Sequence, residues 1–139
     1  FEGRVQYIKK GRLKRLLKSK ENLLIDGCHS TTSAQNLANY LKTIKKPIYG
    51  VWGMQSNRDP KKFIRCFRGV FKKIITLKIP NEPNSEKASR LKKIATEMGF
   101  NVNTAKNTLE ALQCLSNKKE KVIVVFGSLY LVGNALSLN

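Results

Sequence analysis

The stretch LLIDGCHSTTS, residues 23–33, combines the signals of a buried strand, a turn and a helix start. Residues 23–25 are a continuous apolar run of the kind that a parallel strand buries on both faces, and Asp26-Gly27 ends it. Residues 31–33 can cap a helix in which apolar residues recur at spacings of three and four. A strand followed by an amphipathic helix predicts the first half of a parallel β-α-β unit.

The same alternation continues to the end of the chain. Further strands are predicted at residues 48–54, 74–79, 101–105 and 122–126. Helices are predicted to start at Asp59-Pro60 and Ser85-Glu86, and to span residues 108–115 and 129–138. This pattern predicts one α/β domain over residues 22–139, with a mostly parallel sheet and helices on both faces. Residues 1–21 differ, and we expect a linker followed by an edge hairpin made of residues 4–8 and 13–17.

Length and composition limit the class of protein. The 139 residues, 41% of them hydrophobic, suffice for one domain core, and no apolar run approaches the ~20 residues of a membrane span. The chain starts at Phe1 without a leader pattern, so we expect it to be a piece of a longer protein. Cys28, Cys66 and Cys114 are odd in number and widely spaced, which favours reduced thiols in a cytoplasmic protein over disulfides or a metal site.

The formal net charge of +18 is the most unusual property of the composition. It favours polyanionic partners, so a basic α/β module that binds nucleic acid is an alternative function. However, only seven of the 27 basic residues are arginine, they are spread along the chain, and no nucleic-acid-binding motif is present. Solvated lysine faces on helices explain the charge better, and we expect nucleic acid to bind only without specificity.

Polar segments follow three of the predicted strands, at the edge where open parallel sheets bind ligands. Asp26 and His29 follow the first, Arg58 lies in the loop after the second, and Gly127-Ser128 follows the last. Each has a structural alternative: Asp26 as a cap or turn acid, His29 as a satisfied turn residue, Arg58 as a solvated loop residue, and Gly127-Ser128 as a plain turn. The chain has no GxxxxGK[ST] phosphate loop, so it cannot cradle a triphosphate alone.

Four motifs, in order along the chain, resemble those of folylpolyglutamate and dihydrofolate synthases, which belong to the wider Mur ligase superfamily. They are GRVQ (residues 3–6), LLIDGCHS (23–30), VWGM followed by RDP (51–54 and 58–60), and VFGSLYLVG (125–133). The similar family elements lie in the C-terminal domain of those enzymes, and the four motifs span nearly all of this chain.

The resemblance implies a Rossmann-like C-terminal domain that closes over a separate N-terminal ATPase domain, which holds the phosphate loop and the Mg²⁺ ligands. It implies an ATP-dependent ligase that adds L-glutamate to folate or dihydropteroate through an acyl phosphate. Arg4, Asp26 and His29 match positions on the nucleotide side, and Ser128, with Arg58, is expected on the glutamate side. No catalytic residue and no metal ligand is expected in this chain, and alone it is expected to be inactive.

Overall fold

The computed structural model describes residues 4–139, and over that range it contains six strands alternating with six helices. The strands are β1 (Gln6–Ile8), β2 (Glu21–Asp26), β3 (Ile48–Trp52), β4 (Lys73–Thr76), β5 (Val102–Thr104) and β6 (Lys121–Phe126). The helices are α1 (Arg12–Leu16), α2 (Thr31–Leu41), α3 (Pro60–Arg65), α4 (Ala88–Glu97), α5 (Thr108–Leu115) and α6 (Leu129–Leu138).

The strands form one sheet in the order β1-β2-β6-β3-β4-β5. All neighbours are parallel except β1, which pairs antiparallel with β2 at the edge. The chain crosses from β2 to β3 through α2, and β6 later inserts between these two strands. The predicted fold class, an α/β domain with a mostly parallel sheet, is confirmed.

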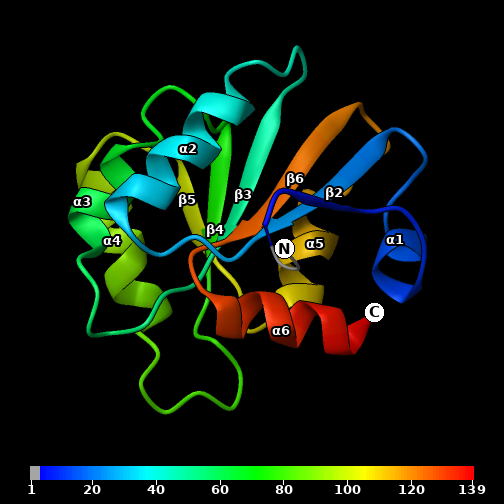
Figure 1. Ribbon diagram of the computed structural model, residues 1–139. Coiled ribbons are helices and arrows are strands. Elements are labelled where there is room, and N and C mark those ends of the chain that lie inside the picture. Colours follow the sequence, from blue (N-terminus) through cyan, green and yellow to red (C-terminus); the bar gives the residue numbers. More distant parts are fainter. Residues whose placement is uncertain (1–3) are drawn as a thin grey trace.

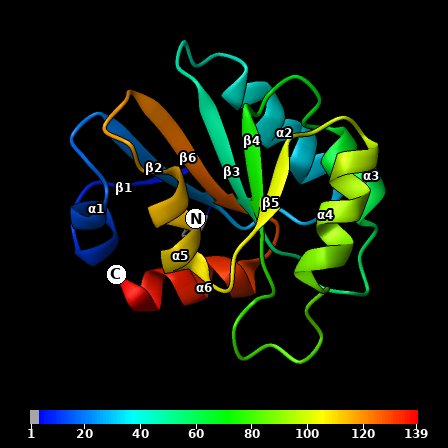
Figure 2. The same cartoon turned by 180° about the vertical axis from the view of Figure 1, so that it is seen from behind.

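Helices cover both faces of this sheet, as Figures 1 and 2 show. Helices α2, α3 and α4 cover one face, where a buried aromatic cluster of Trp52, Phe63, Phe67 and Phe126 fills the centre. Helices α1, α5 and α6 cover the other face, over aliphatic side chains of β2, β3 and β6. The central strand β6 is fully buried, which explains its continuous apolar run from Val122 to Phe126.

The predicted edge hairpin is wrong in its second half. Its first half is β1, but residues 13–17 lie mostly in α1, and β2 is the strand that pairs with β1. Leu13 and Leu17 are buried one helical turn apart in the same core as α5 and α6. Asn139 fixes the start of α1, because its side-chain oxygen accepts a hydrogen bond from the Leu13 N–H at 3.0 Å. Residues 1–3 of the predicted linker lie outside the described residues.

Two helix starts also differ from the prediction. Helix α2 is capped by Ser30, whose hydroxyl accepts from the Ser33 N–H while the Ser33 hydroxyl accepts from the Ser30 N–H, a reciprocal capping box. Helix α4 begins at Ala88 rather than at Ser85-Glu86. Ser85 instead is buried and accepts a hydrogen bond from the Ile79 N–H at 2.8 Å, which closes the loop that follows β4.

The other helix starts agree with the prediction. Asp59 caps α3 by accepting from the Lys62 N–H, and Pro60 occupies the first helical position. Helices α5 and α6 have the predicted bounds, and Asn107 and Ser128 cap them. These caps fix where each helix leaves the sheet edge, so they also fix the geometry of the edge itself.

Candidate functional site

Three glycines mark the carboxyl ends of the neighbouring strands β2, β6 and β3. Phe126, the last residue of β6, is in register with Asp26 on one side and with Trp52 on the other. Gly27, Gly127 and Gly53 therefore follow three adjacent strands at the same level. Local sequence patterns mark Gly127 as a turn but do not predict this alignment, because it depends on β6 lying between β2 and β3.

These glycines allow backbone segments to approach more closely than side chains permit. A Cβ on Gly127 would lie 2.2 Å from the Gly53 carbonyl oxygen, and Gly127 has φ +113°, which side chains rarely adopt. A Cβ on Gly27 would lie 2.3 Å from Leu129 of α6. All three glycines are buried beneath neighbouring backbone and side chains, so these turns allow close packing at the carboxyl ends of the strands.

Asp26 is 2% exposed and anchors two backbone segments. One carboxylate oxygen accepts from the Cys28 N–H at 2.8 Å, and the other accepts from the Val5 N–H at 3.1 Å. Burial raises the pKa of Asp26, while these hydrogen bonds and the positive charge of Arg4 act in the opposite direction. Asp26 therefore connects the backbone of Arg4 and Val5 to the end of β2. It also keeps the positive charge of Arg4 near the Asp26 carboxylate.

His29 and Ser128 are held by local hydrogen bonds beside this anchor. The His29 Nδ1 lies 3.1 Å from the Gly27 carbonyl oxygen; since a carbonyl can only accept, Nδ1 donates. In the neutral ring Nε2 is then the acceptor. Ser128 is 2% exposed and its hydroxyl oxygen accepts from the Tyr130 N–H at 3.0 Å, so its O–H hydrogen remains for another acceptor.

Arg58 lies at the same edge but further out. It is exposed in the loop between β3 and α3, where its backbone N–H donates to the Gln55 carbonyl oxygen at 3.2 Å. The structure thus places Asp26, Ser128 and Arg58 after three neighbouring parallel strands, with His29 three residues beyond Asp26.

Two buried polar atoms near this edge were missed by the sequence analysis. The Trp52 Nε1 and the Gln55 Oε1 have no hydrogen-bond partner among residues 4–139. Trp52 is fully buried, and its Nε1 would lie 2.9 Å from a Cβ on Gly127. Buried polar groups without partners are uncommon, and a bound ligand or water is one of the ways in which their hydrogen bonds are completed. No sequence pattern marks them, because an indole in a buried strand normally indicates only packing.

The part of the chain that the structure describes contains no group of three His, Cys, Asp or Glu side chains able to hold a metal ion. It also contains no helix long and apolar enough to cross a membrane. Cys28, Cys66 and Cys114 are free thiols, and burial raises the pKa of the Cys28 thiol.

Comparison with known proteins identifies the family. A family model described as dihydrofolate synthetase, C-terminal domain, matches residues 9–138. The chain belongs to this family. A search of curated proteins finds no match.

Solved structures share the fold of this family member over nearly its whole length. Mycobacterium tuberculosis folylpolyglutamate synthase complexed with ADP and AMPPCP superposes with a TM-score of 0.81 at 21% identity, covering 98% of this chain and 31% of that chain. Escherichia coli FolC in complex with DHPP and ADP gives 0.79 at 17% identity, covering 99% and 31%. The bifunctional folylpolyglutamate synthase/dihydrofolate synthase of Yersinia pestis with Mn, AMPPNP and L-glutamate gives 0.77 at 19% identity, again covering 99% and 31%.

The chain therefore spans about a third of the length of these proteins. The predicted resemblance is confirmed at the level of family and fold.

Proposed function

We propose that this chain is the nucleotide-side domain of an ATP-dependent ligase that adds L-glutamate to folate or dihydropteroate. The observation that carries the proposal is the edge formed by Asp26-Gly27 and Gly127-Ser128, side by side on β2 and β6, in a member of this family. Similar structures have been solved with ADP, with an ATP analogue and Mn, and with L-glutamate, which supports nucleotide and glutamate as the ligands of such an edge.

The proposed reaction has two steps. A substrate carboxylate attacks the γ-phosphorus of ATP and releases ADP, which gives an acyl phosphate. The neutral amino nitrogen of glutamate then attacks the acyl carbon. The tetrahedral intermediate loses a proton from this nitrogen and expels phosphate, which leaves the amide. Mg²⁺ would neutralise charge on the phosphates during the first step, and we assign its ligands to the N-terminal ATPase domain.

In this scheme the residues of the edge bind and orient the reactants. Arg4 and Asp26 bind the nucleotide together. Asp26 accepts a hydrogen bond from the Val5 N–H and so positions the neighbouring Arg4. His29 lies beside them and can accept a hydrogen bond at Nε2. Ser128 donates its hydroxyl hydrogen toward a carboxylate of glutamate, and Arg58 offers a guanidinium that can hold a carboxylate with two hydrogen bonds.

The partners in this proposal are the N-terminal ATPase domain, ATP, glutamate and folate. A cytoplasmic location is part of the same proposal, supported by the three free thiols.

The test is glutamate-dependent release of ADP from ATP, measured with a pteroate or folate acceptor. We expect none from the 139-residue chain, because it lacks a GxxxxGK[ST] phosphate loop, and we expect turnover when it is joined to its ATPase domain. Turnover by the chain alone, or none by the joined protein, would contradict the proposal.

A further inference from the structure

A hollow of about 360 Å³ lies between α3 and α4, two of the helices that cover the aromatic cluster. The two helices lie side by side in Figures 1 and 2. The hollow is lined by basic residues of α3 and the turn after it, and by residues at the end of α4. These residues are Lys61, Arg65, Arg68, Ile94, Glu97 and Met98.

The α4 side of the hollow lies toward the opposite end of the sheet from Asp26 and Ser128. Helix α4 returns the chain from the carboxyl end of β4 to the amino end of β5, because these two strands are parallel. The last turn of α4, which lines the hollow, therefore lies toward the amino ends of the strands. The lining residues include none of those assigned to nucleotide or glutamate.

The hollow carries a row of basic side chains without counterions. Lys61 and Arg65 lie one helical turn apart, and the Arg68 N–H donates to the Arg65 carbonyl oxygen at 3.3 Å in the turn that follows. The row therefore extends over about 10 Å. Among residues 4–139, none of these three side chains forms an ion pair, and Glu97, which lines the same hollow, forms none either.

Arginine distinguishes this hollow from the lysine-rich surface around it. Only seven of the 27 basic residues in the chain are arginine, and two of them, Arg65 and Arg68, line the hollow. A guanidinium can hold a carboxylate or phosphate with two parallel hydrogen bonds, whereas an ammonium acts as a point charge. The row is therefore suited to a ligand with several spaced anionic groups.

The other lining residues favour carboxylates on a peptide over phosphates on a nucleic acid. Ile94 and Met98 are half-buried and leave apolar surface in the hollow, which an apolar side chain can cover and a phosphate backbone cannot. The Glu97 carboxylate can accept a hydrogen bond from a peptide N–H, but it repels phosphate groups. An acidic peptide that also carries an apolar side chain matches all of these groups.

We propose that the hollow between α3 and α4 docks an acidic segment of a partner protein. Carboxylates of this segment pair with Arg65 and Arg68, and Lys61 adds a third positive charge. An apolar side chain of the segment packs on Ile94 and Met98. The interaction goes beyond the ligase function proposed above and does not depend on it, because it uses none of the same residues.

The first test is fluorescence anisotropy of a short labelled peptide in which glutamates flank a central pair of leucines. The 139-residue chain is titrated into it at about 150 mM salt, which screens distant charges. The double variant Arg65→Gln/Arg68→Gln should bind at least about tenfold more weakly than wild type, because two charge-assisted pairs are lost.

The matched control is Arg12→Gln/Arg15→Gln. It removes two exposed arginines, and the same net charge, from α1 on the other face of the sheet. The control should change affinity less than about twofold, since exposed charges away from the peptide contribute little. Thermal melts of both double variants check that the fold is kept. Equal weakening by the two variants, unchanged binding in Arg65→Gln/Arg68→Gln, or no binding by the wild-type chain would overturn the proposal.

Two further probes test the chemistry of the partner. A peptide of equal charge with serine in place of the leucines should bind at least about threefold more weakly, because it cannot cover Ile94 and Met98. Equal binding of the two peptides would contradict the proposal. A short DNA duplex that binds more tightly than the leucine peptide, and that loses affinity in Arg65→Gln/Arg68→Gln but not in the control, would assign the hollow to nucleic acid instead.

The chain joined to its ATPase domain separates this surface from the ligase site. Arg65→Gln/Arg68→Gln should leave kcat/KM for ATP and for glutamate within about twofold of wild type. A fall of about tenfold or more would place these arginines in the ligase site and overturn the separate role. If the joined protein has no ligase activity, the proposed function fails, and the peptide titration still reports on the hollow.

Discussion

Glu21 and Lys121 form a fully buried ion pair at the amino ends of β2 and β6, with 2.9 Å between Nζ and Oε2. Glu21 also accepts from the Lys18 N–H, the Ser116 hydroxyl and the Asn117 N–H, so its carboxylate is surrounded by donors. Lys121 donates in addition to the Asn117 side chain. A counterion and several hydrogen bonds of this kind make a buried charge tolerable.

Removing the charge of Glu21 should be costly, because the buried ammonium of Lys121 would lose its counterion. We expect Glu21→Gln to lower the free energy of unfolding by about 3–5 kcal/mol in urea denaturation. The control is Glu120→Gln, since Glu120 is exposed and lies 4.0 Å from Lys46; we expect a change below about 1 kcal/mol. Similar losses in the two variants would show that burial does not set the strength of the pair.

The Glu21 network should also make stability depend on pH. Burial raises the pKa of Glu21, but hydrogen bonds from Ser116, the Lys18 N–H, Lys121 and the Asn117 N–H outweigh it and lower the pKa from 4.5 to about 2. Because the folded state holds this proton less tightly than the unfolded state, the stabilisation is complete above pH 4.5. It is lost as the pH falls to about 2. Unfolding free energies of wild type and Glu21→Gln should therefore converge over this range, and parallel curves would contradict the assignment.

Asp26 illustrates how sequence can find a position and only part of its contacts. A carboxylate directly after a buried strand predicted a ligand contact or a cap or turn acid. The structure shows the turn contact, from the Cys28 N–H, and adds a contact from the distant Val5 N–H. The Val5 contact spans 21 residues and depends on β1 pairing with β2, which no local pattern specifies.

Asp26→Ala should affect both stability and catalysis. Two N–H groups lose their acceptor, so we expect a loss of about 1–3 kcal/mol in the free energy of unfolding. In the joined ligase, kcat/KM should fall at least about tenfold with a raised KM for ATP, because Arg4 is no longer positioned. Asp59→Ala is the control: it removes the α3 cap, costs about 1 kcal/mol and should leave KM for ATP unchanged. A destabilised Asp26→Ala enzyme with normal kinetics would limit Asp26 to a structural role.

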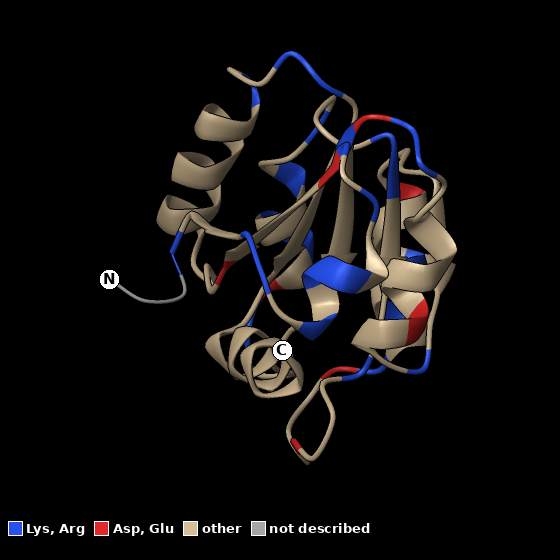
Figure 3. Ribbon diagram, turned by 90° about the vertical axis from the view of Figure 1, so that its right-hand side faces the viewer, with Lys and Arg blue, Asp and Glu red and all other residues tan. Residues whose placement is uncertain are grey.

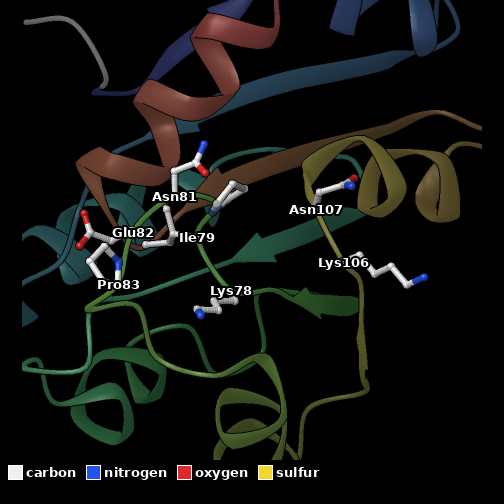
Figure 4. Close-up of a pocket in the computed structure, with 8 residues that line it drawn as sticks. Lys78, Ile79, Asn81, Glu82, Pro83, Lys106 and Asn107 are labelled. Atoms are coloured by element: carbon white, nitrogen blue, oxygen red, sulfur yellow. The ribbon is translucent and has the colours of Figure 1, made fainter.

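At the scale of elements, the sequence predicts most strands and helices, and its errors have physical causes. Helices α5 and α6 were predicted with their observed bounds because caps and apolar periodicity agree there. Helix α1 was mistaken for a strand, although Leu13, Leu16 and Leu17 have helical spacing, because the segment is short and its stability comes from contacts with α5 and Asn139. The surface hollow at the carboxyl ends of β4 and β5 (Figure 4), lined by residues 78–83, Lys106 and Asn107, was not predicted, since it depends on strand order.

The packed turns at the edge give a prediction about two glycines. Gly127→Ala should lower the free energy of unfolding by more than about 3 kcal/mol, because its Cβ would overlap the Gly53 carbonyl oxygen and φ is +113°. Gly133→Ala is the matched control, since Gly133 lies within α6 and nothing beyond the adjacent α6 backbone lies within 4 Å of the added Cβ. We expect it to stabilise by about 0.5–1 kcal/mol through helix propensity. Equal stability of the two variants would show that the edge backbone can relax.

At the scale of the whole molecule, the basic residues that give the net charge of +18 are not concentrated in one region. Figure 3 shows lysine and arginine on helices, strand ends and loops, with few acidic residues between them. Such a distribution attracts polyanions from all sides by its long-range field, without the geometry that reads a base sequence.

This distribution predicts that duplex DNA binds weakly, without sequence preference and with strong salt dependence. Basic residues that contact phosphates release counterions, so affinity should fall at least about tenfold between 50 and 200 mM salt. Two duplexes of equal length and unrelated sequence should bind within about twofold of each other, because sequence selectivity requires contacts to base edges. Fluorescence anisotropy over a salt series measures both quantities. The double variants Lys78→Gln/Lys106→Gln and Lys92→Gln/Lys93→Gln should weaken DNA binding equally, since each removes two exposed positive charges and a delocalised field depends on total charge. A duplex preference that persists at high salt would instead favour a nucleic-acid-binding module over a ligase domain.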